Sequence, residues 1–189
     1  MASILRKLGS SSKQEAVEVY MFEPSKEDKN IIHVRMGDAP PIYTVKLSTK
    51  KDPDVFVWRG SDTSEKHAAM ATIDKPTMTA NLMVQDLTLP MKTNKDWGSA
   101  KVEHPQYGLL RWKTGLQGNP STLSDGEENE LAKHKTVGMH VTGGPRELKM
   151  LVEADEDMML VVVSTLIVAR RLSGIAMERN ANLMYGITS

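Results

Sequence analysis

The segment from Met158 to Ala169 reads MMLVVVSTLIVA, and this run near the end of the chain decides the fold. Only Ser164 and Thr165 in it are polar, so a helix over these residues is apolar on every face and has to be surrounded on every face. Acidic residues precede the run and Arg170-Arg171 follows it, which matches the dipole of a helix. We therefore predict a core helix over about residues 155–172, capped by Asp155 or Asp157.

Two other interpretations of the apolar run are a buried strand and a membrane span. The segment from Val161 to Val163 is β-branched, as strands often are, but twelve residues is long for one strand and the flanking charges favour a helix. A helix over this run spans about 18 Å, well short of the ~30 Å hydrocarbon core of a bilayer. No transmembrane span is therefore expected.

The chain before this run reads as short strands separated by turn residues. The segment from Ile42 to Leu47 alternates cleanly between two faces, as a strand does. We expect strands at 17–22, 31–36, 42–47, 55–58, 67–73, 79–84, 87–91, 107–112, 136–141 and 147–152, and loops at 92–106 and 117–133. This layout predicts a mainly β fold, a closed antiparallel β-barrel of about 10–12 strands around a central hydrophobic C-terminal α-helix.

Composition describes an average globular chain. Its 189 residues include 24 basic and 24 acidic side chains and no cysteine, and 40% of them are apolar. This length suits one core, so we expect a flexible N-terminal segment at 1–14 and a single domain at 15–189. The first nine residues lack the ~7–15 consecutive apolar residues of a secretory signal. With no cysteine, a cytoplasmic location is the default expectation.

The layout resembles the tubby C-terminal-like superfamily, which includes tubby domains, phospholipid scramblases, plant LURP-one-related proteins and small fungal proteins of the same class. Residues 30–34 and 41–45 resemble the first hairpin of that family. Residues 107–113 resemble its central Tyr-x-x-x-x-Trp-Lys strand, and 148–152 followed by 157–172 resemble its last strand and core helix. The resemblance implies a twelve-stranded barrel closed around a hydrophobic helix. The chain lacks the cysteine-rich segment and calcium loop of scramblases, which argues against scramblase activity.

A second resemblance concerns activity. The chain is similar in mass to a ribosome-inactivating protein of mushrooms, and Glu178-Arg179 resembles the Glu-Ala-x-Arg element of the plant ribosome-inactivating proteins. This resemblance implies an rRNA N-glycosylase that hydrolyses one adenine N-glycosidic bond in the sarcin–ricin loop of ribosomal RNA and so inhibits translation. Hydrolysis of this kind needs no cofactor.

Depurination requires an acid or cation at the leaving base, a carboxylate that stabilises the oxocarbenium ion or activates water, and aromatic faces around the purine. The candidate catalytic residues are Glu178 and Arg179, and the candidate substrate-binding residues are Tyr107, Arg111, Trp97 and Tyr185. Because Tyr107 and Arg111 are four positions apart, we expect both on one face of a strand, opposite Trp112. The plainer interpretation is an exposed helix end at Glu178 and a solvent-facing strand at Arg111.

The balance of charges weighs against RNA as a partner, because RNA-binding proteins usually carry a basic face. A folded patch of Lys92, Lys95, Lys101, Arg111 and Lys113 would answer part of that objection. The alternatives are a non-enzymatic module that binds anionic lipid headgroups, such as phosphoinositides, and a protein-interaction module. The five histidines show no spacing typical of a metal site, so no metal is expected. The oligomeric state stays open.

Overall fold

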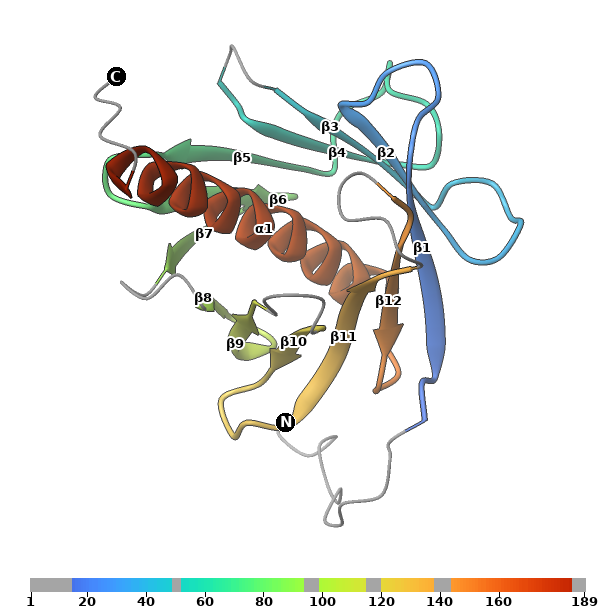
Figure 1. The fold of residues 1–189 in the computed structure, drawn as a ribbon. Helices are drawn as coiled ribbons and strands as arrows, with labels where there is room; N and C mark the ends of the chain where they lie inside the picture. Colours follow the sequence, from blue (N-terminus) through green and yellow to red (C-terminus); the bar gives the residue numbers. More distant parts are fainter. Residues whose placement is uncertain (1–14, 49–51, 94–98, 115–119, 138–143, 185–189) are drawn as a thin grey trace.

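Twelve strands close into one antiparallel barrel around a single helix (Figure 1). This computed structural model describes residues 15–48, 52–93, 99–114, 120–137 and 144–184. Each strand pairs with its neighbours in the chain, and β1 pairs with β12 to close the ring. The elements are β1 (Glu18–Pro24), β2 (Ile31–Arg35), β3 (Tyr43–Leu47), β4 (Val55–Arg59), β5 (Ala69–Asp74), β6 (Thr79–Val84), β7 (Leu87–Thr93), β8 (Ser99–His104), β9 (Gly108–Lys113), β10 (Ser121–Ser124), β11 (Glu130–Thr136), β12 (Arg146–Met150) and α1 (Glu156–Met184).

The prediction of a mainly β barrel around an apolar C-terminal helix is confirmed, and the architecture is consistent with a tubby C-terminal-like fold. An eight-stranded barrel is just wide enough for its own side chains to fill, so twelve strands leave room for a helix about 10 Å across. Residues 159–169 of α1 are all buried, together with the inward-facing residues of the strands. Helix and wall are therefore two parts of one core.

One buried hydrogen bond fixes how the helix is seated in the barrel. The indole Nε1 of Trp112, on β9, donates to Oγ1 of Thr165 at 2.9 Å, and both side chains are almost completely buried. The Thr165 hydroxyl in turn donates to the carbonyl of Val161 at 2.7 Å. Thr165, a polar residue of the apolar run, thus has a hydrogen-bond partner. Trp112 can reach it only when the helix lies at one rotation about its axis and one depth in the barrel.

The helix begins as predicted and ends later than predicted. Asp155 caps its first turn, where its Oδ1 accepts the amide of Met158 at 2.7 Å. The helix continues twelve residues beyond residue 172, because the segment after Leu172 contains few helix-breaking residues. Arg170 and Arg171 consequently lie in mid-helix, and they do not complement its C-terminal dipole as expected.

The added length also changes the comparison with a membrane span. By length and composition alone, Glu156–Asn180 would be sufficient to cross a bilayer, so the prediction that the helix is too short is wrong. In this fold, 72% of its most apolar window is buried inside the protein. The apolar side chains of α1 therefore pack inside the barrel and form part of its core.

The two predicted loops contain strands. Residues 92–106 include the end of β7 and all of β8, and residues 117–133 include β10 and the first half of β11. In β8 the inward residues are Ala100, Val102 and His104, too small or too polar to give an apolar alternation. β10 has four residues, and β11 carries an irregularity at its pairing with β10, opposite Leu123 and Ser124. Each of these strands is held by its two neighbours rather than by a strong pattern of its own.

The expectations at two other segments are settled only in part. The strand expected at 136–141 is replaced by β11, which ends at Thr136, and residues 138–141 lie outside the described residues. The N-terminal segment 1–14 also lies outside them.

A histidine faces the interior of β11. His134 is 4% exposed, its ring meets the ring of Phe22 edge-on at 5.5 Å between centroids, and its Nε2 has no hydrogen-bond partner among the described residues. Burial, with a smaller contribution from the nearby Arg146, lowers the pKa of His134 to about 3. The folded barrel therefore holds this imidazole in its neutral form.

We predict that the Trp112–Thr165 bond couples the stabilities of helix and wall. Trp112→Phe and Thr165→Val should each lower the unfolding free energy by about 1–3 kcal/mol, because each removes one partner of a buried hydrogen bond. The double variant should lose about 1 kcal/mol less than the sum. Urea denaturation measures all three. The control pair is Trp58→Phe with Thr165→Val, which should be additive because Trp58 bonds to the carbonyl of Glu65 instead.

We also predict a loss of stability in acid that originates at His134. The pKa of this group is about 3 in the fold, against 6.5 when it is unperturbed, so between these values the unfolded chain binds more protons. Unfolding free energy should therefore fall as pH is lowered from 6.5, by up to about 1.4 kcal/mol per pH unit from this group. His134→Leu should remove that component, as seen in urea denaturation at pH 7, 6, 5 and 4. Parallel pH profiles of variant and wild type would contradict the assignment.

Candidate functional site

The two candidate catalytic residues lie near the C-terminal end of α1. Glu178 and Arg179 are both exposed. Arg179 Nη1 donates to the carbonyl of Lys75, in the turn between β5 and β6, at 3.4 Å. Among the described residues, neither side chain forms an ion pair. Both groups are free to meet a ligand at this end of the barrel.

Tyr107 lies at the opposite end of the barrel. Its hydroxyl donates to Oδ1 of Asp155 at 3.1 Å, and its ring stacks on His104 with centroids 4.5 Å apart. Burial, followed by the hydrogen bond to Asp155, raises the pKa of Tyr107 to about 12. The side chain thus packs beside the start of α1, where it supports the residue that caps the helix.

The prediction that Tyr107 and Arg111 share a face is wrong. The strand begins at Gly108, whose φ of +70° lies in the left-handed region, so Tyr107 belongs to the preceding turn and faces the mouth of the barrel. Arg111 lies on the outer wall, where its Nη1 is 3.3 Å from Oε1 of Glu128. Trp112 faces inward, as predicted.

The candidate residues therefore do not form one catalytic centre. Asp155, beside Tyr107, and Arg179 are 24 positions apart, and α1 covers about 36 Å over that length. Tyr107 cannot hold a purine against Glu178 and Arg179. The other two candidates, Trp97 and Tyr185, lie outside the described residues.

The structure places four of the five residues of the suggested basic patch on one outer surface. Lys92 on β7 is directly opposite Lys101 on β8, and Lys101 is directly opposite Arg111 on β9. We call these three residues the cation ladder. All three point outward, and Lys92 and Lys101 are exposed. Lys113 lies two positions beyond Arg111 on the same face, and Lys95 lies outside the described residues.

Further basic residues extend this surface around the barrel. Lys113 pairs in register with Thr122, Thr122 with Lys133, and Lys133 with Lys149, all on outer positions. The outer surface from β7 to β12, here called the basic wall, carries Lys92, Lys101, Arg111, Lys113, Lys133, Lys135 and Lys149. The acidic residues on the same strands and facing outward are Glu103, Glu130 and Glu147.

The ladder is electrostatically unfavourable in the isolated protein. Paired residues on neighbouring strands have Cβ atoms about 5 Å apart, and like charges directly opposite each other destabilise a sheet. Lys133 is paired with Glu130 at 2.6 Å and Lys149 with Glu147 at 3.4 Å. Within the described part of the chain, Lys92 and Lys101 of the ladder and the neighbouring Lys113 have no ion pair, whereas Arg111 is paired with Glu128. An anion placed over the wall would relieve their mutual repulsion.

Acidic residues gather at the end of the barrel where α1 begins. Glu153, Asp155, Glu156 and Asp157 surround the helix N-terminus, where the dipole favours negative charge. Arg59, at the end of β4, bridges Glu156 and Asp157, and Gln85 donates to Asp157 at 2.8 Å. Behind a formal charge of zero, charge is thus unevenly distributed, with an acidic end and a basic wall.

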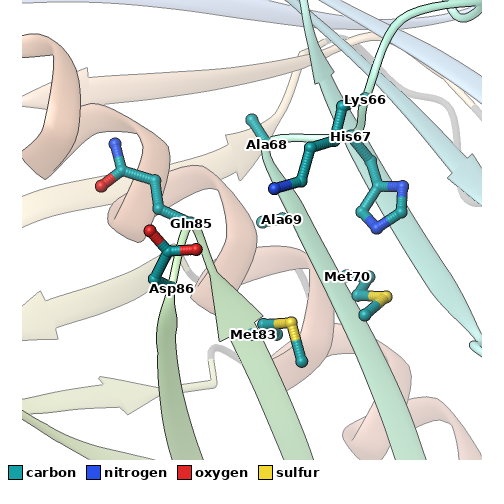
Figure 2. A pocket seen from close by; sticks show the side chains of 8 residues that line it. All are labelled: Lys66, His67, Ala68, Ala69, Met70, Met83, Gln85 and Asp86. Atoms are coloured by element: carbon teal, nitrogen blue, oxygen red, sulfur yellow. The ribbon is translucent and has the colours of Figure 1, made fainter.

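A hollow of about 270 Å³ opens on the outer surface of β5 and β6, at the same end as the acidic residues (Figure 2). Methionine and alanine side chains provide its apolar part, and polar side chains stand around them. Its lining residues are Lys66, His67, Ala68, Ala69, Met70, Met83, Gln85 and Asp86. No local pattern in the sequence indicates this hollow, because it depends on which outward residues of β5 and β6 become neighbours.

No group of three or more metal-ligating side chains is assembled within the described residues. Comparison with known proteins gives no assignment either: no family model, curated protein or solved structure matches this chain. Its function has to be inferred from the surfaces described above.

Proposed function

We propose that this chain is an RNA-binding barrel whose contact surface is the basic wall, and that it belongs to the tubby C-terminal-like class. The observation that carries the proposal is the cation ladder, three basic residues in register on three adjacent strands. Affinity for nucleic acid comes largely from basic side chains that neutralise phosphates. A row of repeated cations suits a polymer with a repeated negative charge.

The surroundings of the ladder favour RNA over an anionic membrane. Proteins that lie on a bilayer combine basic residues with large apolar side chains that enter the headgroup region. The exposed large apolar residues of the described chain are Val17, Val19, Met36, Met83, Leu87 and Met177. Leu87 is at the other end of β7 from Lys92, and Val19 is opposite Lys149 at the edge of the wall, so neither is beside the ladder. The central part of the wall offers charge without an apolar anchor.

Depurination of ribosomal RNA is a second candidate function, favoured by the position of Glu178 and Arg179 relative to the wall. Arg179 contacts the carbonyl of Lys75, and Thr93, next to Lys92, donates to the carbonyl of Met78 in the same turn at 2.9 Å. The pair therefore stands beside one end of the ladder. In this proposal Arg179 stabilises the departing adenine and Glu178 the oxocarbenium ion.

RNA binding is tested by removing the unpaired lysines of the wall. Lys92→Gln, Lys101→Gln and Lys113→Gln in one variant should weaken binding of a single-stranded RNA at least tenfold, measured by fluorescence anisotropy. The slope of log affinity against log salt should become shallower by about 2, since each lost phosphate contact contributes about 0.7. The matched control is Lys26→Gln, Lys29→Gln and Lys46→Gln, which removes equal charge from exposed positions elsewhere.

Equal losses in the two triple variants would contradict a defined contact surface, and no binding by wild type at low salt would overturn the proposal. Vesicles containing phosphoinositides provide the remaining comparison. Binding to vesicles but not to RNA would favour the lipid alternative.

Depurination is tested in a mammalian translation lysate. Wild-type protein should stop synthesis and leave a site in the large-subunit rRNA that aniline cleaves. Glu178→Gln and Arg179→Ala should each abolish the aniline fragment while circular dichroism stays unchanged, because both side chains are exposed. Intact rRNA and normal translation with wild-type protein at micromolar concentration would refute this candidate, without bearing on RNA binding by the wall.

A further inference from the structure

We propose that the hollow on β5 and β6 holds one unpaired base of the RNA strand that the basic wall binds. This inference rests on the proposed RNA binding and adds a site of a different chemical kind. The wall carries charge for phosphates, whereas the hollow joins apolar side chains to a few polar groups (Figure 2). A binding surface for single-stranded RNA commonly combines a basic groove with rings on which bases stack, and His67 is the ring in the lining of this hollow.

The hollow and the ladder lie on adjoining strands of one outer surface. Met83, in the lining of the hollow, is directly opposite Thr88 on β7, and Lys92 is four positions further along that strand. Four strand residues cover about 13 Å. The outward positions between them are occupied by Asn81 on β6 and Pro90 on β7, which are exposed and uncharged. A strand of RNA can pass from the ladder to the hollow without meeting an acidic side chain on β7.

The composition of the hollow suits a base better than a phosphate. Asp86 stands at its edge, and Asp157 is close behind because Gln85 donates to that carboxylate at 2.8 Å. These two negative charges disfavour a phosphate at this position. Met70 and Met83 are neighbours across the β5–β6 pairing and present two polarisable thioether side chains. They offer a flat heterocycle an adaptable apolar contact.

The polar groups at the rim can hydrogen-bond the edge of a base. Lys66 provides only donors, the carboxylate of Asp86 provides acceptors, and Gln85 keeps its amide oxygen free of the bond to Asp157. A volume of about 270 Å³ lies just below the ~300–1,000 Å³ of typical small-molecule sites. The hollow therefore matches one heterocycle rather than a larger ligand.

The turn that carries Gln85 places this side chain at the edge of the hollow, because only Gln85 and Asp86 join β6 to β7. Gln85 has a φ of +52°, in the left-handed region where glycine is favoured and other residues are strained. A long polar side chain is nevertheless placed there, at the edge of the hollow, and it is held by Asp157. A two-residue hairpin loop requires this backbone conformation, so the turn itself accounts for the φ of Gln85 and fixes where its side chain stands.

The experiment compares two RNA probes on the full-length protein. One is a single-stranded oligonucleotide of about 12 nucleotides, and the other has the same backbone with abasic positions throughout. Fluorescence anisotropy should show wild type binding the base-bearing probe about tenfold more tightly, the effect of stacking one base. Met83→Ser should reduce that ratio below about threefold and leave the salt dependence of binding unchanged, because the wall is intact.

Met36→Ser is the matched control, because Met36 is 40% exposed, as against 39% for Met83, and lies outside the hollow. It should retain the wild-type ratio. Equal binding of both probes by wild type, or an unchanged ratio in Met83→Ser, would overturn the base site while leaving RNA binding by the wall in place. Absence of salt-dependent binding to either probe would instead refute the proposed function itself.

Discussion

The need to fill a twelve-stranded barrel governs the rest of this structure. A ring of that size is too wide for its own side chains to close the interior, and a helix apolar on every face has no stable place in water. Each element therefore requires the other. Apolar contacts alone would allow several rotations and depths of the helix in the barrel. The hydrogen bond between Trp112 and Thr165 selects one of them. Because the core is shared in this way, the outer surface of the strands is left available for binding.

The direction of the helix also organises charge around the barrel. Its N-terminal end attracts acidic residues, which Arg59 and Gln85 join to the neighbouring strand ends. Basic residues instead occupy outer positions of β7 to β12. A chain with no net charge thus carries a basic surface on one side of the barrel, and this surface supports the proposed binding of RNA. Local potential, rather than total charge, determines what such a protein attracts.

How far the fold and the candidate site could be predicted depended on the strength of local patterns. The run from Met158 to Ala169 and the alternation at Tyr43 to Leu47 are strong signals, and both elements were predicted. Strands β8 and β10 were missed because their inward residues are small, polar or few, and pairing with neighbours holds them in place. Among the site residues, Arg111 was correctly placed on an outer face, while Tyr107 was misplaced because Gly108 turns the chain between them.

The sequence by itself determined that one apolar helix near the C-terminus would be enclosed by strands, since hydrophobic periodicity is a local property of the chain. It also suggested a patch of Lys92, Lys95, Lys101, Arg111 and Lys113. Only the tertiary structure decided that Lys92, Lys101 and Arg111 stand directly opposite one another, and that Tyr107 is separated by the length of α1 from Glu178 and Arg179. Register and the closure of the ring set those relations. They arise between residues distant in the chain, and no local pattern encodes them.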